Sequence, residues 1–174
     1  MTNRTRVLFA ALTFAGTAAV FGGGESMPPR MPVNATFQRM KALVGDWKGA
    51  THDGGSTTVS YSLVADGSAI MERMKPTGPD GATEEMISMY APDGDGVMMT
   101  HYCSMHNQPR MRASASESGP IAFHFVDATN LATPDSAHMD HVTLTMDGDR
   151  MSQAWTFKTA GKEQDATFTY TRVK

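Results

Sequence analysis

Asp-Gly pairs recur along the chain from residue 53 onward, and they separate short segments in which apolar and polar residues alternate. An Asp-Gly pair readily supplies the positive φ angles that a tight β-hairpin needs. Alternation with a period of two is typical of a β-strand with one buried face. The sequence therefore predicts a series of hairpins, with turns at Asp53-Gly54, Asp66-Gly67, Asp80-Gly81, Asp93-Gly94 and Asp147-Gly148.

The alternating segments predict strands at residues 46–51, 57–64, 68–75, 83–90, 96–103, 110–115, 121–128, 138–146, 151–159 and 165–173. An antiparallel sheet with one wet face has to cover its apolar face, and no long helix is predicted that could cover it. The predicted fold class is therefore all-β, a single antiparallel up-and-down β-barrel of about 8–10 strands with a short N-terminal helix. Closure of such a barrel requires the first strand to pair with the last.

The predicted helix precedes the first strand. Asn34 is a suitable N-cap, and the helix is expected to end near Val44. Phe37, Met40 and Leu43 fall on one side of it at helical spacing. We expect this apolar side to face inward and the helix to plug or cover one end of the barrel.

The first residues are typical of a targeting segment. Arg4 and Arg6 precede an uncharged, mostly apolar stretch at residues 7–21. We interpret residues 1–24 as a signal peptide, residues 25–36 as a flexible leader and residues 37–174 as the barrel domain. The expected location is outside the cytoplasm, periplasmic or secreted, with no membrane span after signal cleavage; an uncleaved anchor is the alternative.

Charge and cysteine content restrict the function classes. The formal net charge is −3, so no basic surface for nucleic acid is expected. The single cysteine, Cys103, cannot form an internal disulfide. It is either a buried, inert thiol or a thiol with a function. The sequence does not define the oligomeric state.

Residues 100–111, THYCSMHNQPRM, concentrate polar groups in the middle of the chain. In extended geometry Met99, His101 and Cys103 share one face, and we expect that face to line the barrel interior. A polar cluster on an apolar wall can orient a ligand, although His101 and Tyr102 could equally lock the strand end to the next loop. The predicted ligand-binding residues are His101, Cys103, Met99, Tyr90, Arg110, Arg112, His124 and Trp155.

The segment Leu43-Val44-Gly45-Asp46-Trp47-Lys48-Gly49 resembles the Gly-x-Trp entry of lipocalin-like barrels, the calycins. The chain is also similar to exported bacterial lipocalin-like proteins of unknown function that share a THYC…NQPR segment, and to fatty-acid-binding-protein and nitrobindin branches in length. The resemblance implies structural roles for Gly45 and Trp47, with Arg172 packed over the tryptophan. Nitrobindin-like proteins bind haem through a histidine in the C-terminal part of the barrel, for which His138 and His141 are the nearest candidates here.

A metal- or haem-binding barrel is the first alternative function. His101, Cys103 and His106 are ligand types that suit zinc or copper. His138 and His141 are expected on opposite faces of a strand, which is unsuitable spacing for chelation. The methionines are dispersed along strands, as is typical of cores and adaptable pockets.

Catalysis is not predicted, and no residue is assigned a catalytic role. Cys103 and His101 would lie about 6.5–7 Å apart along a strand, beyond the reach of a nucleophile and its base. We therefore interpret the chain as an exported barrel that binds a small apolar or amphipathic molecule, oriented by residues 100–112. The sequence predicts no particular cofactor. The other alternative function is that of a structural or interaction module without a ligand.

Overall fold

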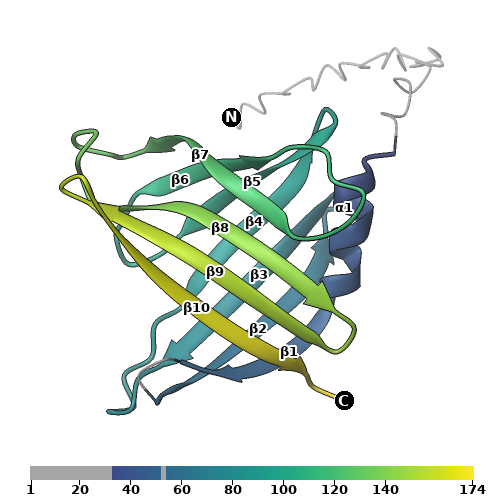
Figure 1. Ribbon diagram of the computed structural model, residues 1–174, viewed down its shortest axis with the longest axis horizontal. Coiled ribbons are helices and arrows are strands. Elements are labelled where there is room, and N and C mark those ends of the chain that lie inside the picture. Colours follow the sequence, from purple (N-terminus) through teal and green to yellow (C-terminus); the bar gives the residue numbers. More distant parts are fainter. Residues whose placement is uncertain (1–32, 52–53) are drawn as a thin grey trace, which may run out of the picture. The chain divides into compact units, whose positions relative to one another are not determined.

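The computed structural model describes residues 33–51 and 54–174, which form a closed antiparallel barrel of ten strands in up-and-down order (Figure 1). Each strand pairs with its neighbours in sequence, and β1 pairs with β10. The predicted signal peptide and most of the predicted leader lie outside the described residues. The strands are β1 Gly45–Ala50, β2 Ser56–Val64, β3 Ala69–Thr77, β4 Met86–Asp93, β5 Gly96–Tyr102, β6 Gln108–Ala113, β7 Ile121–Thr129, β8 His138–Asp147, β9 Arg150–Thr159 and β10 Lys162–Arg172.

The all-β class, the barrel and the short helix are confirmed. The glycines of the five predicted Asp-Gly pairs all have positive φ angles, and between β2 and β3 Asp66 and Gly67 have φ angles of +55° and +79°. Asp53 lies outside the described residues. The largest difference between predicted and observed strand bounds is at β4, which was predicted at residues 83–90 and runs from Met86 to Asp93. Thr83 lies outside the strand because it makes only an isolated bridge to Thr77.

A short helix, α1 Ala35–Met40, continues as a 3-10 turn at Lys41–Leu43. Asn34 caps it by accepting a hydrogen bond from the Phe37 amide at 2.8 Å, as predicted, so the last residues of the predicted leader belong to this element. The Asn34 amide also donates to the Gly96 carbonyl at 2.5 Å, which ties the helix to β5. Phe37, Met40 and Leu43 are buried in the barrel core. The helix therefore covers one end of the barrel.

Barrel closure places Arg172 opposite Trp47. The guanidinium carbon lies 4.0 Å from the Trp47 ring centroid, and Trp47 Nε1 donates to the Leu43 carbonyl at 2.8 Å. Arg172 also donates to the Val44 carbonyl at 2.9 Å. Gly45 has a φ of +126°, and a Cβ there would lie 3.0 Å from Arg172 Nη1. The pairing of the end strands and the arginine–tryptophan contact are confirmed.

Replacing Arg172 with Ala should lower the free energy of unfolding by about 0.5–2 kcal/mol through loss of the cation–π contact with Trp47 and of the packing of the arginine stem, and further through loss of its hydrogen bonds to the Val44 and Ala42 carbonyls. Lys174→Ala is a matched control, since Arg172 and Lys174 both approach Asp149, at 3.4 and 3.5 Å, but only Arg172 covers the tryptophan. Urea denaturation measures both changes. Equal effects of the two substitutions would contradict this assignment.

Candidate functional site

A carboxyl group lies in the middle of the barrel interior. Glu72 on β3 is 1% exposed. Tyr90 on β4 donates to its Oε2 at 2.5 Å, and Gln153 on β9 donates to its Oε1 at 3.1 Å. No lysine or arginine is buried in the part of the chain that the structure describes. Glu72 is therefore stabilised by neutral hydrogen-bond donors rather than by a cation.

Glu72, Tyr90, Gln153, Tyr61 and Trp155 form one hydrogen-bonded cluster, the Glu72 network. Trp155 determines which end of the Gln153 side chain accepts and which end donates. An indole nitrogen can only donate, so Trp155 Nε1, 3.0 Å away, requires Oε1 of Gln153 as its acceptor. The Gln153 amide nitrogen then faces the Tyr61 hydroxyl at 2.6 Å and Glu72. Burial raises the pKa of Glu72, while the hydrogen bonds from Tyr90 and Gln153 act in the opposite direction.

His101 on β5 lies between this network and a cavity. It is 1% exposed, its Nδ1 lies 3.0 Å from the Ser88 hydroxyl, and its ring is 4.8 Å from the Trp155 ring. Its Nε2 is buried without a hydrogen-bond partner. Burial lowers the pKa of His101 to about 4, although the negative charge of Glu84 acts to raise it. The imidazole is therefore uncharged near neutral pH.

The cavity beside His101 has a volume of about 70 Å³. Pockets for drug-sized ligands usually measure about 300–1,000 Å³, so this one fits a very small molecule or one end of a larger one. Gln164, at its rim, is exposed, so the cavity reaches the surface near the start of β10. Its walls are formed by Met74, Met86, His101, Met139, Trp155, Phe157, Gln164, Ala166 and Phe168.

Two of the predicted ligand-binding residues, His101 and Trp155, line this cavity. Met99 and Tyr90 are also buried in the core but do not line the cavity, and Tyr90 belongs to the Glu72 network. Cys103 follows the end of β5, is half-buried and packs against the core. Burial raises the pKa of its thiol, so the reactive thiolate is disfavoured.

Arg110 and Arg112, which are predicted among the ligand-binding residues, lie on the outer face of the barrel and do not reach His101. On β6 the buried position between them is Met111, so the alternation of the strand directs both arginines outward. Arg110 Nε donates to Asp127 at 2.6 Å, and Arg112 Nε donates to Asp93 at 2.7 Å. These pairs are surface contacts.

His124, another predicted ligand-binding residue, is exposed on the outer face, with its ring 4.9 Å from the His141 ring. The expectation that His138 and His141 point to opposite faces was wrong. A register shift between Met139 and His141 allows both histidines to approach Asp140, with His138 Nε2 at 3.5 Å. Even so, no group of three or more metal-ligating side chains with suitable geometry occurs in the described ranges.

Glu72, Ser88 and Gln153 were not predicted as site residues. In the two-residue alternation of its strand, each of them occupies an inward position that buried apolar residues also occupy. Glu72, for example, lies between the buried residues Ile70 and Met74. This alternation was the sequence signal that could have identified the three residues as interior. A charged residue at an interior position is rare, however, and is easily assigned to the surface.

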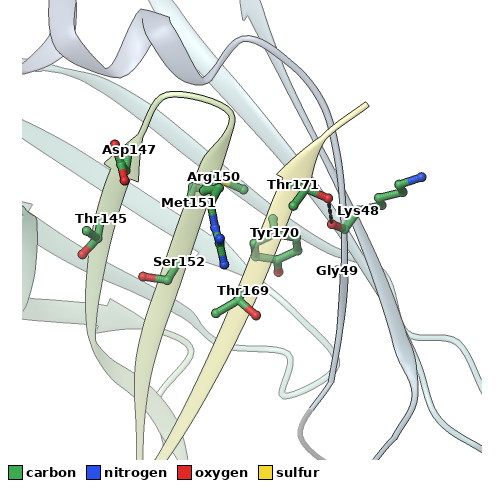
Figure 2. A pocket seen from close by; sticks show the side chains of 10 residues that line it. All are labelled: Lys48, Gly49, Thr145, Asp147, Arg150, Met151, Ser152, Thr169, Tyr170 and Thr171. Carbon is green, nitrogen blue, oxygen red and sulfur yellow. Dashed lines mark hydrogen bonds between the residues drawn. The ribbon is translucent and has the colours of Figure 1, made fainter. Parts of the chain in front are cut away.

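A larger hollow of about 300 Å³ lies on the outer face across β1, β8, β9 and β10. In Figure 2, Arg150 extends along β9 toward β10, while Lys48 points away from the other side chains. Thr171 donates to the Lys48 carbonyl at 3.5 Å. The cationic groups of this hollow do not converge. Tyr170, which lines it, has a buried hydroxyl without a hydrogen-bond partner, but the unpartnered Nε2 of His101 lies in the wall of a mostly apolar cavity, so the cavity at His101 is the better candidate site.

The described residues contain no helix long and apolar enough to cross a membrane. No protein-family model matches the chain, and no curated protein matches it. Among solved structures, the crystal structure of Rv2717c from M. tuberculosis is similar, with a TM-score of 0.63 and 14% sequence identity over 82% of this chain and 99% of that chain. At this identity the likeness supports the barrel fold alone.

Proposed function

We propose that this protein is an exported binding protein that holds a small, uncharged, mostly apolar molecule in the cavity beside His101. The observation that carries the proposal is the Nε2 atom of His101, which is buried, has no hydrogen-bond partner and lines an apolar cavity. Leaving such an atom unpaired costs about 1–3 kcal/mol, and a ligand that pairs with it recovers part of that cost.

The cavity favours an uncharged ligand. Its wall consists of methionine, aromatic and alanine side chains, with His101 and Gln164 as the polar exceptions. The low pKa of His101 leaves no positive charge on the imidazole at neutral pH. A carboxylate or an ammonium group would therefore lose its hydration without gaining a counter-charge.

Export is proposed from the sequence of residues 1–24, in which basic residues precede an uncharged apolar stretch. N-terminal sequencing of the protein recovered from a cell fractionation tests this part. A mature chain that begins beyond the apolar stretch, in the periplasm or the medium, is the expected result. A cytoplasmic chain that retains residues 1–24 would contradict it.

Binding can be followed through Trp155, which lines the cavity, whereas the other tryptophan, Trp47, does not. Titration with small uncharged molecules such as 2-butanone should change the tryptophan emission in a saturable way. His101→Ala should weaken binding by about tenfold, equivalent to about 1.4 kcal/mol. His106→Ala, an exposed substitution in the loop after β5, is the matched control and should leave binding unchanged.

The emission change should be lost in Trp155→Phe. A linear, unsaturable response in the wild-type protein would contradict the proposal. So would a His101→Ala variant that binds as tightly as the wild type. If His101→Ala mainly lowers the free energy of unfolding and leaves binding unchanged, the histidine only stabilises the strand end.

A metal- or haem-binding barrel is the second candidate, and the same unpartnered Nε2 is the observation that favours it. A porphyrin is much larger than a cavity of about 70 Å³, so the residues present do not fit haem. The described residues also offer no group of three metal-ligating side chains. Metal analysis and the visible absorbance of the natively purified protein distinguish the two candidates, because the binding-protein proposal predicts neither signal.

A further inference from the structure

The barrel wall opens between β7 and β8. The pairing of these two strands ends at His124 on β7, opposite His141 on β8. Beyond this point, within the described ranges, residues 125–129 of β7 pair with β6 alone, and residues 138–139 of β8 pair with β9 alone. In Figure 1 the two strands diverge toward the loop that joins them. The sheet therefore has two free edges at this place.

An irregularity in each strand accompanies the opening. On β7, Val126 is an extra residue relative to β6, and on β8, Asp140 is an extra residue relative to β9. An extra residue of this kind bends its strand and disrupts the regular ladder. The two extra residues lie on either side of the point where the strands separate, so the opening is built into both strands.

The free edge of β7 carries main-chain groups without a partner strand. Alternate residues of an antiparallel strand direct their N–H and C=O groups to opposite sides, so part of residues 125–129 points away from β6. In the part of the chain that the structure describes, no hydrogen bond of a turn or loop reaches the main chain of these residues. At a rise of about 3.4 Å per residue the edge is about 17 Å long. Such an edge is a template for an added strand.

A hollow of about 440 Å³ lies along this edge. Residues of β7 form one side, including Phe125 and Val126, and the loop residues Leu131, Ala132 and Pro134 form another. The volume falls in the range of about 300–1,000 Å³ that is typical of ligand sites. The hollow is therefore large enough to receive apolar side chains from a bound segment.

The loop between β7 and β8 is tied to other parts of the barrel. The Asn107 amide donates to the Ala137 carbonyl at 2.8 Å, which joins this loop to the one after β5. The Ala160 main-chain amide donates to the Asp135 carbonyl at 3.1 Å, which joins the loop to the turn before β10. The loop forms a wall of the hollow and does not supply the missing strand.

The charged groups around the hollow are already paired. Asp127 forms an ion pair with Arg110 on β6. Asp140 contacts His141 and lies 3.9 Å from the Lys158 ammonium group. A charged partner would therefore lose its hydration without gaining a free counter-charge. The apolar lining and the paired charges together favour an uncharged, apolar occupant.

We propose that an uncharged, extended segment of a partner protein, with β-branched apolar residues at alternate positions, binds in this gap as an added strand along residues 125–129. Its main chain pairs with the free edge of β7, and its apolar side chains enter the hollow. A small molecule fills the hollow and leaves the edge groups without a partner, whereas an extended main chain satisfies both. This surface is separate from the cavity at His101, and the inference does not depend on the proposed function.

The probe for this inference is the peptide acetyl-TVTVT-amide. Two further peptides carry N-methyl groups on the threonines or on the valines, which removes the main-chain donors of one edge and keeps every side chain. In ¹H–¹⁵N correlation spectra, we expect the unmodified peptide to cause saturable shifts centred on the amides of residues 125–129. At least one methylated peptide should bind about tenfold more weakly, because it cannot pair with β7.

A substitution in the hollow tests the position of the peptide. Ala132→Trp places a large side chain in the loop wall of the hollow and should weaken binding of acetyl-TVTVT-amide by about tenfold. Ala154→Trp is the matched control, because Ala154 is exposed on β9 and does not line the hollow, and this variant should bind as the wild type does. The dispersion of the same spectra shows whether each variant is folded.

The outcomes decide between an added strand and its alternatives. Weaker binding of both methylated peptides would support insertion between the free edges of β7 and β8. Equal binding of all three peptides would overturn the inference, because the hollow would then take side chains without main-chain pairing. Absence of saturable shifts, or shifts centred on Met74 and Trp155 at the other cavity, would overturn it as well. None of these results changes the test of the cavity at His101.

Discussion

Replacing Glu72 with Ala should lower the free energy of unfolding by about 3–5 kcal/mol, because it removes the acceptor of two buried donors and leaves a cavity. Tyr90 and Gln153 donate to the Glu72 carboxyl group at 2.5 and 3.1 Å, and no lysine or arginine is buried among residues 33–51 and 54–174. Urea denaturation with a two-state fit measures the change. Glu117→Ala, at an exposed loop position, is the control and should change stability by less than about 0.5 kcal/mol.

The Glu72 network can also be recognised by its pH dependence. Burial raises the pKa of Glu72 in the folded protein, so the native state holds this proton to higher pH than the unfolded state does. The contribution of this proton on Glu72 to the free energy of unfolding is therefore fully present below the pKa of Glu72 in the unfolded state, about 4.3. It is lost as the pH rises through the pKa of Glu72 in the folded state. Glu72→Gln should remove this slope. A Glu72→Ala variant with wild-type stability would contradict the structural role of the network.

Lowering the pH from 6.5 to 4 should destabilise the protein by about 3 kcal/mol through His101 alone. The pKa of His101 falls from 6.5 to about 4 on folding, because burial disfavours the charged ring. Over this range the unfolded state binds the proton and the native state does not, so stability falls as the pH falls. A pKa lowered by about 2.5, at about 1.4 kcal/mol per pKa unit, corresponds to about 3.5 kcal/mol in full, of which about 3 kcal/mol falls between pH 6.5 and 4.

The His101 contribution is the difference between the wild type and His101→Gln, measured by urea denaturation at several pH values. Glu72 titrates in both proteins, so its opposing slope cancels in this difference. His106→Gln, at an exposed position in the loop after β5, is the control for replacing a histidine with glutamine elsewhere in the chain. Identical pH dependence in wild type and His101→Gln would show that the imidazole is not buried in its neutral form.

The barrel could be predicted because its determinants are local in sequence. Alternation such as Met151, Gln153 and Trp155 defines the inner face of β9, and Asp-Gly pairs define the turns. The helix cap at Asn34 and the contact between Trp47 and Arg172 also follow from short sequence patterns. Each of these features depends on backbone geometry that the residue type itself restricts.

The site was predicted only in part, because it depends on contacts between strands that are distant in sequence. The predicted cluster near residue 101 included Arg110 and Arg112, although Met111 between them is the inward position of β6. The partner of His101 proved to be Ser88, placed there by the pairing of β4 with β5. Even a known strand order would not have given the approach of His138 and His141 to Asp140, which depends on a register shift within β8.

The most direct test of the cavity at His101 is nuclear Overhauser contact between a bound probe and the methionine methyl groups. Met74, Met86 and Met139 line the cavity, whereas Met105 is 40% exposed in the loop after β5. In protein with labelled methionine methyl groups and an excess of 2-butanone, we expect contacts from the probe to Met74, Met86 and Met139 that disappear in His101→Phe, whose larger ring occupies the site. Contacts to Met105 alone, or no contact at saturating probe, would contradict the account.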